Sequence, residues 1–504
     1  MPDRDFFNLR DAVQLLESRG ELATVSGRIH WDVELGALCR EVYRRKGPAL
    51  LFSNIQDYPA ETARCSQLVS GLFASMRRVS LLLGFDDVQP NKRLVEYVLE
   101  RNDMRIAPRI VESGPVHKHV ITGKDIDLLE FPVPRWHFLD AGRYIGTLGC
   151  VVTKDPETQQ LNVGIYRGMV VDRDRIAVLI ISSQSWEIFR EKYRARNEPV
   201  PMAWVFGWDP IMEFIAGTTF PNGVCEYEVM GAYRGRPVPL VKCKTVDLLV
   251  PADAEMVVEG YLSLDPSTFA LEGPFGEVTG YASDVPTMRP AMKVTAITHR
   301  DDPLFRATAA AGLPNAPSEF GYVIAIQRAA IAWNVLRNAG IPGILNVCVQ
   351  PISNGTTVIV QIKKTYEGQP KQIAAALWGS LTCKSVYKIV IVVDDDIDPT
   401  SYEAVDWAIN YRVDPGSDDL GVFRSTIGWA LDPSAPLENR QPSELGIALG
   451  NRLLIDATKT WRFPRRAEWN NEKFPPVSVN RPEDIERMKR RWEEYRIKNW
   501  DEKF

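Results

Sequence analysis

Short extended segments dominate the chain between residues 116 and 310, and they constrain its fold more than any other feature. Each segment is rich in β-branched residues and is bounded by Gly, Pro or Asp, which is typical of strands joined by turns. A helical stretch at residues 185–196 interrupts them. Many short strands with few helices predict a barrel-like sheet. The predicted strands are residues 145–152, 163–171, 175–181, 224–230, 238–250 and 292–299.

Mixed α/β sequence flanks this β-rich region on both sides. Apolar side chains at helical spacing predict helices, and short apolar runs predict buried strands. Before the β-rich region we expect helices at residues 32–45 and 62–83 around a strand at 49–52. After it we expect a long helix at 318–339, a hairpin of 345–350 and 357–363, a helix at 371–381, a strand at 387–393, and a terminal helix at 482–498 capped by Asn480.

The chain has 504 residues, which is too long for one ordinary core and predicts several domains. The fold class is therefore mixed α+β and α/β, with a central barrel, flanking α/β domains and a C-terminal helix. The expected parts are an N-terminal α/β domain (1–115), the barrel (116–317), a linking helix (318–342), a C-terminal α/β domain (343–465) and a tail (466–504).

Composition excludes several classes of protein. The net charge of −5 gives no basic footprint for nucleic acid. The longest apolar runs, such as 176–181 and 389–393, are far too short to span a membrane, and no leader opens the chain, so we expect no membrane association. Seven cysteines without a Cys-x-x-Cys spacing indicate free thiols in a cytoplasmic protein. With five histidines, a His-rich metal cage is excluded; His117 and His119 share a face of a predicted strand, which we interpret as exposed.

Residues 271–277, Leu-Glu-Gly-Pro-Phe-Gly-Glu, place two carboxylates five residues apart around a bend. In a regular strand such a pair would point to opposite faces, but the glycines and the proline let the two side chains converge. Converging carboxylates push their pKa values apart, so that one holds a proton near neutral pH while the other stays charged. The alternative is an acidic surface loop.

Two further segments decide between these interpretations. Residues 162–169 read Asn-Val-Gly-Ile-Tyr-Arg-Gly-Met, and residues 223–228 read Gly-Val-Cys-Glu-Tyr-Glu. Each alone is compatible with an ordinary strand. Together with residues 271–277 they resemble the UbiD-type decarboxylases, enzymes that use prenylated flavin mononucleotide (FMN). The resemblance extends from about residue 116 to 458 and includes the segments 155–158, 240–243, 250–255, 392–399 and 455–458.

This resemblance implies a split β-barrel that binds the modified flavin and a catalytic set of Arg167, Glu272 and Glu277. Glu277 takes the position of the proton donor, and Glu272 is expected to be the ionised partner of Arg167. Asn162 and Glu226 take the positions that hold Mn²⁺ or Mg²⁺ against the flavin phosphate, and their oxygens suit such hard cations. K⁺ is a further candidate ion. The expected cofactor contacts are Asn162, Ile165, Tyr166, Arg167, Gln184, Ser185, Glu226 and Lys388.

Two points of this assignment stay open. Asn162 and Arg167 have opposite strand parity, so either Gly164 forms a bulge or the two residues serve different ends of the cofactor. The ferulate-type branch carries a Gln-His pair where this chain has Gln184-Ser185, which leaves the metal shell to be completed by water or by Ser185. Lys388 is expected either to reach the phosphate or to lie in solvent at a strand edge.

The predicted function is reversible, non-oxidative decarboxylation of a small aromatic or heteroaromatic acid. A flavin prenyltransferase would supply the cofactor, and the resemblance implies a homodimer or homohexamer. Residues 308–320 and 423–431 are the candidate pocket walls. Two alternatives remain: a polyprenylated 4-hydroxybenzoate decarboxylase of ubiquinone synthesis, and a flavin-binding relative without catalysis. A redox flavoenzyme would need a nicotinamide site, and the sequence has no such signature.

Overall fold

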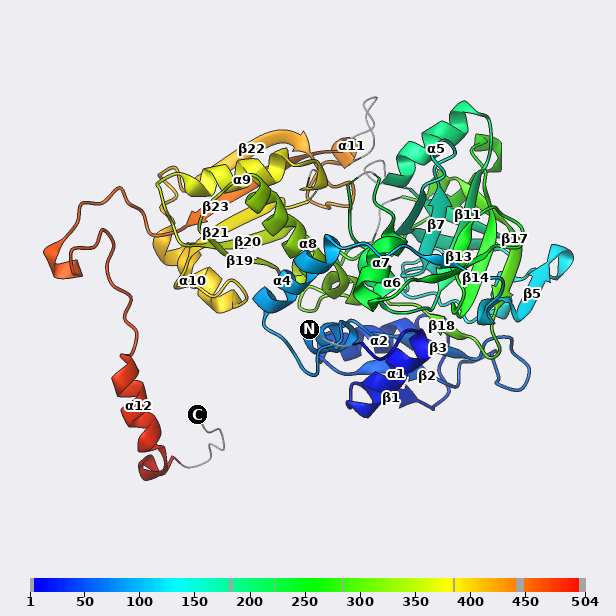
Figure 1. The fold of residues 1–504 in the computed structure, drawn as a ribbon, viewed down its shortest axis with the longest axis horizontal. Helices are drawn as coiled ribbons and strands as arrows, with labels where there is room; N and C mark the ends of the chain where they lie inside the picture. Colours follow the sequence, from blue (N-terminus) through cyan, green and yellow to red (C-terminus); the bar gives the residue numbers. More distant parts are fainter. Residues whose placement is uncertain are drawn as a thin grey trace. The chain divides into compact units, whose positions relative to one another are not determined.

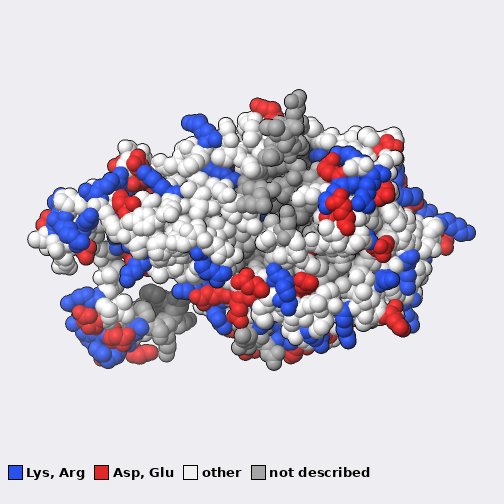
Figure 2. Space-filling model, turned by 45° about the horizontal axis from the view of Figure 1, so that its top comes forward, with Lys and Arg blue, Asp and Glu red and all other residues white. Residues whose placement is uncertain are grey.

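The protein, described by a computed structural model, divides into two compact units, Met1–Ala457 and Thr458–Phe504. The structure describes residues 4–180, 185–221, 223–282, 285–383, 386–440 and 448–497. Figure 1 follows the chain through these elements. Over this part of the chain, no helix has both the length and the apolar character that a membrane crossing requires. On the face shown in Figure 2, Lys and Arg are interspersed with Asp and Glu.

A strongly curved sheet of nine strands among the described residues forms the centre of the first unit (Figure 1). Its strands follow the order β6-β9-β10-β17-β14-β11-β7-β8, with β5 paired to β17, and they form a nearly closed barrel. This confirms the predicted barrel-like sheet. The strands are β5 (His119–Thr122), β6 (Tyr144–Gly146), β7 (Cys150–Lys154), β8 (Leu161–Ile165), β9 (Arg167–Asp172), β10 (Arg175–Leu179), β11 (Val200–Phe206), β14 (Met256–Leu262) and β17 (Ala291–His299).

Close packing around one tryptophan fixes the wall of the barrel that carries the site. Every residue of β11 is buried, which requires that both faces of this strand are covered. The fully buried indole of Trp204 lies against two paired glycines, Gly146 of β6 and Gly168 of β9. A Cβ atom at either glycine would lie 2.1 Å from the indole. Only glycine therefore lets β6 and β9 approach Trp204 this closely.

Smaller elements surround the barrel. Helix α5 (Ser185–Ala195) lies where a helix was predicted. Strands β12 (Pro239–Lys242), β13 (Leu249–Pro251) and β4 (Arg109–Ile110) form a separate three-stranded sheet, and β15 (Ala270–Glu272) pairs with β16 (Thr287–Arg289). The helices beside them are α6 (Ile211–Ala216) and α7 (Glu226–Arg234).

The N-terminal region forms a four-stranded sheet with the order β1-β2-β3-β18. Strand β18 (Leu304–Arg306) follows the barrel in sequence, yet it pairs in parallel with β3. The chain thus returns from the barrel to its own beginning, which ties the two layers together. The other elements are α1 (Leu9–Ser18), β1 (Leu22–Val25), α2 (Glu34–Arg44), β2 (Ala49–Phe52), β3 (Gln67–Ser70), α3 (Met76–Leu82) and α4 (Asn91–Asn102).

A long helix, α8 (Glu319–Asn338), leads into the second α/β layer. Its five strands have the order β19-β20-β21-β23-β22. The predicted hairpin is present, with β19 and β20 antiparallel and Asn354 at the turn. The elements are β19 (Ile344–Val349), β20 (Thr357–Ile362), α9 (Gln369–Gly379), β21 (Ile389–Asp394), α10 (Tyr402–Arg412), β22 (Leu420–Ile427), α11 (Leu437–Arg440) and β23 (Leu449–Ala457). The second unit carries helix α12 (Pro482–Arg490).

Several local predictions are wrong. The predicted strands 145–152 and 238–250 are each divided into two shorter strands. Residues 62–83 are not one helix, because β3 precedes α3, and Ser75 caps that helix by accepting from the Arg78 amide. Residues 224–230 are not a strand but the start of α7. His117 and His119 do not share a strand, since His117 ends a 3-10 turn. The terminal helix begins after Arg481 without a side-chain cap, so Asn480 does not cap it.

Candidate active site

Arg167 lies between the two carboxylates of residues 271–277. Its Nη2 donates to Glu272 Oε2 at 2.7 Å, and its Nη1 donates to Glu277 Oε1. All three side chains are largely buried, with Glu272 only 1% and Glu277 7% exposed. The structure thus brings together the three residues that the sequence predicted as a catalytic set.

The bend between the two glutamates makes this convergence possible. Glu272 ends β15, and Gly273 follows with a φ of 90°, a conformation that favours glycine. The backbone of Glu277 is then fixed on both sides. Its N–H donates to Tyr281 O at 2.9 Å, and its carbonyl accepts from the amides of Gly280 and Gly312. The Glu277 side chain is therefore held by a rigid loop.

The guanidinium of Arg167 contacts both carboxylates, and Arg289 acts on Glu272 from a longer distance. Burial raises the pKa of Glu277, Arg167 opposes this shift, and the neighbouring Glu272 adds to it. Burial lowers the pKa of Arg167, but Glu277 and Glu272 outweigh burial and raise it overall. Two like charges this close cannot both ionise easily. The arrangement therefore favours a proton on Glu277. It differs from the predicted division of roles in that Arg167 contacts both glutamates.

Three further residues support this set, and sequence reasoning missed them. The buried Tyr144 hydroxyl donates to Glu272 Oε1 at 2.9 Å. The guanidinium of Arg167 lies over the ring of Phe275, with 5.2 Å between Arg167 Cζ and the ring centroid. Asp140 accepts from the Gly276 amide at 2.8 Å and so anchors the glutamate loop, while burial raises the pKa of Asp140 to about 6. No local motif marks Tyr144 or Asp140, because their partners lie more than 100 residues away in sequence.

Asn162 and Glu226 meet at a second buried position. Asn162 Nδ2 donates to Glu226 Oε1 at 3.0 Å, and the Val163 amide donates to Glu226 Oε2 at 3.0 Å. Asn162 Oδ1 is buried without a hydrogen-bond partner, and burial raises the pKa of Glu226 to about 7. An orphaned amide oxygen beside a desolvated carboxylate fits a hard divalent cation.

Residues 162–167 connect the two positions: β8 carries Asn162, Tyr166 follows the strand, and Arg167 begins β9. Strand β8 pairs with β7 in unbroken register from Leu161 to Ile165, so Gly164 forms no bulge. Five residue steps from Asn162 to Arg167 cover about 16 Å in an extended chain. That span is comparable to the length of a flavin mononucleotide from its phosphate to its ring system. With no bulge at Gly164, the second of the two alternatives remains, in which Asn162 and Arg167 serve different ends of the cofactor, and it stays a prediction.

A cavity lies at each end of this segment. The cavity at Asn162 has a volume of about 250 Å³, and Asp155, Lys192 and Glu226 contribute to its lining. The cavity at Arg167 has a volume of about 180 Å³. Both predicted wall segments contribute to it, and its lining is Gly146, Thr147, Ile165, Tyr166, Arg167, Leu179, Phe275, Glu277, Val278, Ala310, Phe320, Arg328, Trp429 and Leu431.

The cavity at Arg167 contains a second cation that the sequence did not indicate. Arg328 of α8 lines it and donates to the Asn354 carbonyl. Burial lowers the pKa of Arg328. Within a helix that is largely buried, one arginine gives no sequence signal of its own. Two guanidinium groups with mostly apolar neighbours suit a small organic anion.

The other predicted cofactor contacts do not all lie at the two cavities. Ile165 and Tyr166 line the cavity at Arg167. Gln184 lies outside the described residues, as does the side chain of Ser185. Lys388 forms an ion pair with Asp432 at 2.8 Å, and it lines neither cavity. Its predicted contact with a phosphate therefore has no support from the geometry.

Family comparisons cover most of the chain. Sequence models of three domains of 3-octaprenyl-4-hydroxybenzoate carboxy-lyase, UbiD, match it in order. The N-terminal domain matches residues 13–98, the Rift-related domain matches residues 109–314, and the C-terminal domain matches residues 321–457.

Solved structures of the same class are similar over nearly the whole length. Vanillic acid decarboxylase of Sedimentibacter hydroxybenzoicus in its closed form is 30% identical with a TM-score of 0.82, over 98% of this chain and 100% of that one. The UbiD-class enzyme HmfF of Pelotomaculum thermopropionicum in complex with FMN is 29% identical with a TM-score of 0.80, over 95% and 98%. An evolved dimeric form of HmfF in complex with prFMN is 28% identical with a TM-score of 0.76, over 95% and 99%.

Proposed function

The chain belongs to the UbiD family and is a carboxy-lyase, and from this premise we propose that it reversibly decarboxylates a small aromatic or heteroaromatic acid with prenylated FMN. The observation that carries the proposal is the buried Arg167 held between Glu272 and Glu277 at the wall of a small cavity. A flavin-binding protein without catalysis would need phosphate and metal contacts but no buried acid. A polyprenylated substrate would need a wide apolar channel, and liposome co-sedimentation would distinguish that alternative from a small acid.

The cofactor would extend along β8 from one cavity to the other. Asn162 and Glu226 would hold Mn²⁺ or Mg²⁺ beside its phosphate, with K⁺ as a further ion, and Ile165 and Tyr166 would lie along its body. When bound, prenylated FMN supplies the electron sink that side chains lack for a carbon losing CO₂. A flavin prenyltransferase would provide it, and the assembly would be a homodimer or homohexamer.

The chain's own residues have three tasks in this reaction. Arg167 and Arg328 attract and orient the substrate carboxylate, because both guanidinium groups line the cavity. Apolar walls that include Leu179, Phe320 and Leu431 exclude water and so strengthen these electrostatic contacts. Glu277 holds a proton and donates it from its carboxyl oxygen to the ring carbon as CO₂ departs, which leaves Glu277 as an anion beside Arg167.

A Glu277→Gln variant tests the assignment of the acid. Glutamine keeps the size of the side chain and can still accept from Arg167, but it cannot deliver a proton. We expect turnover to fall by about 10²- to 10⁴-fold, the range for general acid catalysis, while flavin absorbance stays unchanged. Glu112→Gln, at an exposed glutamate, is the matched control and should keep full turnover. Turnover of Glu277→Gln equal to that of the control would refute the role of Glu277.

A further inference from the structure

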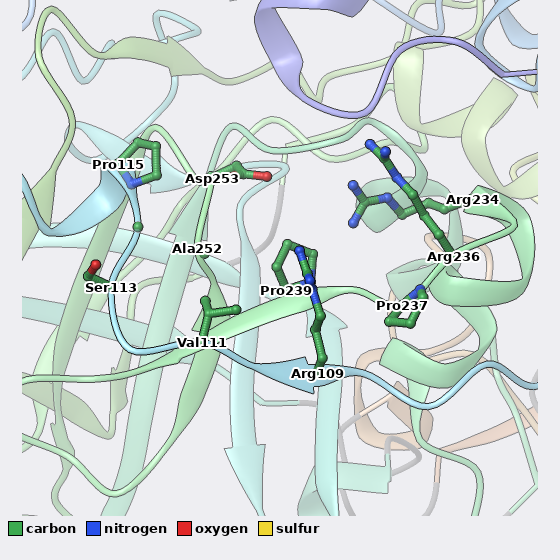
Figure 3. Close-up of a pocket in the computed structure, with 11 residues that line it drawn as sticks. Arg109, Val111, Ser113, Pro115, Arg234, Arg236, Pro237, Pro239, Ala252 and Asp253 are labelled. Carbon is green, nitrogen blue, oxygen red and sulfur yellow. The ribbon is translucent and has the colours of Figure 1, made fainter.

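A third pocket lies away from both cavities of the active site. It has a volume of about 490 Å³ and shares no lining residue with them. Strands β4, β12 and β13 and the end of α7 surround it (Figure 3). Its lining residues are Arg109, Val111, Ser113, Gly114, Pro115, Arg234, Arg236, Pro237, Pro239, Ala252 and Asp253.

Arg234, at the end of α7, is the buried element of this pocket. Its side chain is 1% exposed, its Nη2 donates to Phe7 O at 3.3 Å, and its guanidinium lies 4.8 Å from the ring centroid of Trp208, while Nε and Nη1 make no hydrogen bond with any described residue. The nearest carboxylate, Asp209, lies 3.4 Å from Nε, but Arg4 already engages both oxygens of Asp209, at 2.6 and 3.1 Å. Burial lowers the pKa of Arg234 to about 10. Its positive charge nevertheless adds to the charge of the pocket, which Arg234 lines.

Two more guanidinium groups share the pocket. Figure 3 shows Arg234 and Arg236 extending towards the space that the Asp253 carboxylate faces, with Arg109 rising beside Pro239. Arg109 and Arg236 are exposed, and neither forms an ion pair in the described part of the chain. Three positive groups thus face one carboxylate, which leaves a local charge of +2.

Apolar residues form most of the rest of the pocket wall. Three prolines line it, and proline offers no backbone donor and has a fixed φ. Pro239 lies in β12, and backbone hydrogen bonds hold this side of the pocket, from Arg109 N to Val238 O at 2.9 Å and from Ala252 N to Pro239 O at 2.9 Å. A preformed pocket of this kind loses little entropy when it binds a ligand.

We propose that this pocket binds a small molecule that carries a phosphate monoester on an apolar body. The forked donors of arginine match the oxygens of phosphate, and a dianion neutralises the local charge of +2. The proline rings, Val111 and Ala252 would contact the apolar body. Because the pocket shares no lining residue with the active site, the ligand would bind at a site separate from that of the substrate. The inference is independent of the proposed function.

Isothermal titration of the purified full chain with phenyl phosphate tests this proposal. We expect saturable binding at one site per chain, with weaker binding of inorganic phosphate, which lacks the ring, and of phthalate, whose two carboxylates do not form one compact dianion. The double variant Arg109→Gln/Arg236→Gln should weaken binding of phenyl phosphate by about ten- to a hundredfold, the loss expected for charge-assisted hydrogen bonds. Both residues are exposed, so the fold should tolerate the change.

Two further variants make the test specific. Arg28→Gln, at an exposed arginine that does not line the pocket, should bind phenyl phosphate like the wild type. Asp253→Asn should bind it several-fold more tightly, because it removes the one negative charge of the pocket. Absence of saturable binding to the wild type would overturn the proposal. So would equal affinity in the double variant and in Arg28→Gln, or inorganic phosphate binding as tightly as phenyl phosphate.

Discussion

Substituting Gly168 by alanine should disturb the active site without touching any catalytic side chain. Gly168 directly follows Arg167 on β9, and its added Cβ would lie 2.1 Å from Trp204 Cη2 and 2.7 Å from Cζ3. Carbon atoms in contact normally lie about 3.5 to 4.0 Å apart, so the overlap is roughly 1.4 Å. Trp204 cannot move away easily, because it is fully buried and its Nε1 donates to Gly149 O at 3.0 Å.

The strand must therefore shift by about an ångström and carry Arg167 with it. Overpacking of this kind costs about 1 to 3 kcal/mol of stability. A displacement of about 1 Å at a reacting group can reduce turnover by about 10²-fold. The assay is the thermal unfolding midpoint of Gly168→Ala together with its turnover at matched flavin content.

Gly27→Ala is the matched control, because a Cβ at Gly27 meets nothing within 4 Å and its φ is not in the left-handed region. A second substitution, Trp204→Phe, removes the atoms that clash. The double variant Gly168→Ala/Trp204→Phe should therefore lose less stability than the losses of the two single variants add up to. Unchanged midpoint and turnover in Gly168→Ala, or strict additivity in the double variant, would refute the reasoning.

Two further predictions concern the acid and the metal position. In the proposed reaction Glu277 acts in its protonated form. Burial together with nearby carboxylates raises its pKa, so kcat should fall as the pH rises through that pKa. Asp140→Asn removes one of these negative charges and should move the fall to lower pH; an unmoved profile contradicts the assigned acid. Glu226→Gln should lower both the divalent metal content by mass spectrometry and the flavin absorbance after purification. Glu228→Gln, on the same helix, should leave both unchanged, and equal metal and flavin contents in the two variants would remove Glu226 from the metal position.

Helices and strands that bury only one face were predicted well, because their apolar residues recur with the period of the helix or strand. Helix α2 and the β19–β20 hairpin were predicted nearly to their ends, since apolar spacing and the turn residues mark them. Helix α7 was missed because almost all its residues are buried, so it has no polar face to reveal a helical period. Gly235, which follows it with a φ of 67°, was a usable stop signal that the prediction did not weigh.

Only those site residues that lie in short sequence motifs were predictable. The segments around Arg167, Glu272 and Glu277 are recognisable because each packs several functional residues into a few positions. Tyr144 and Arg328 were not predictable, because their place at the site arises from contacts between distant segments. Lys388, expected either to reach a phosphate or to lie at a strand edge, forms an ion pair with Asp432, and its phosphate contact stays a prediction.

Deuterium exchange tests the central claim most directly, namely that a buried carboxyl group delivers a proton to a ring carbon. The holoenzyme is incubated in D₂O with a panel of aromatic and heteroaromatic acids and with their decarboxylated products, and exchange is followed by proton NMR. The account predicts that at least one product incorporates a single deuterium at the carbon that bore the carboxyl group. A fully flavin-loaded enzyme that releases CO₂ from an acid but leaves that carbon free of solvent deuterium would contradict it.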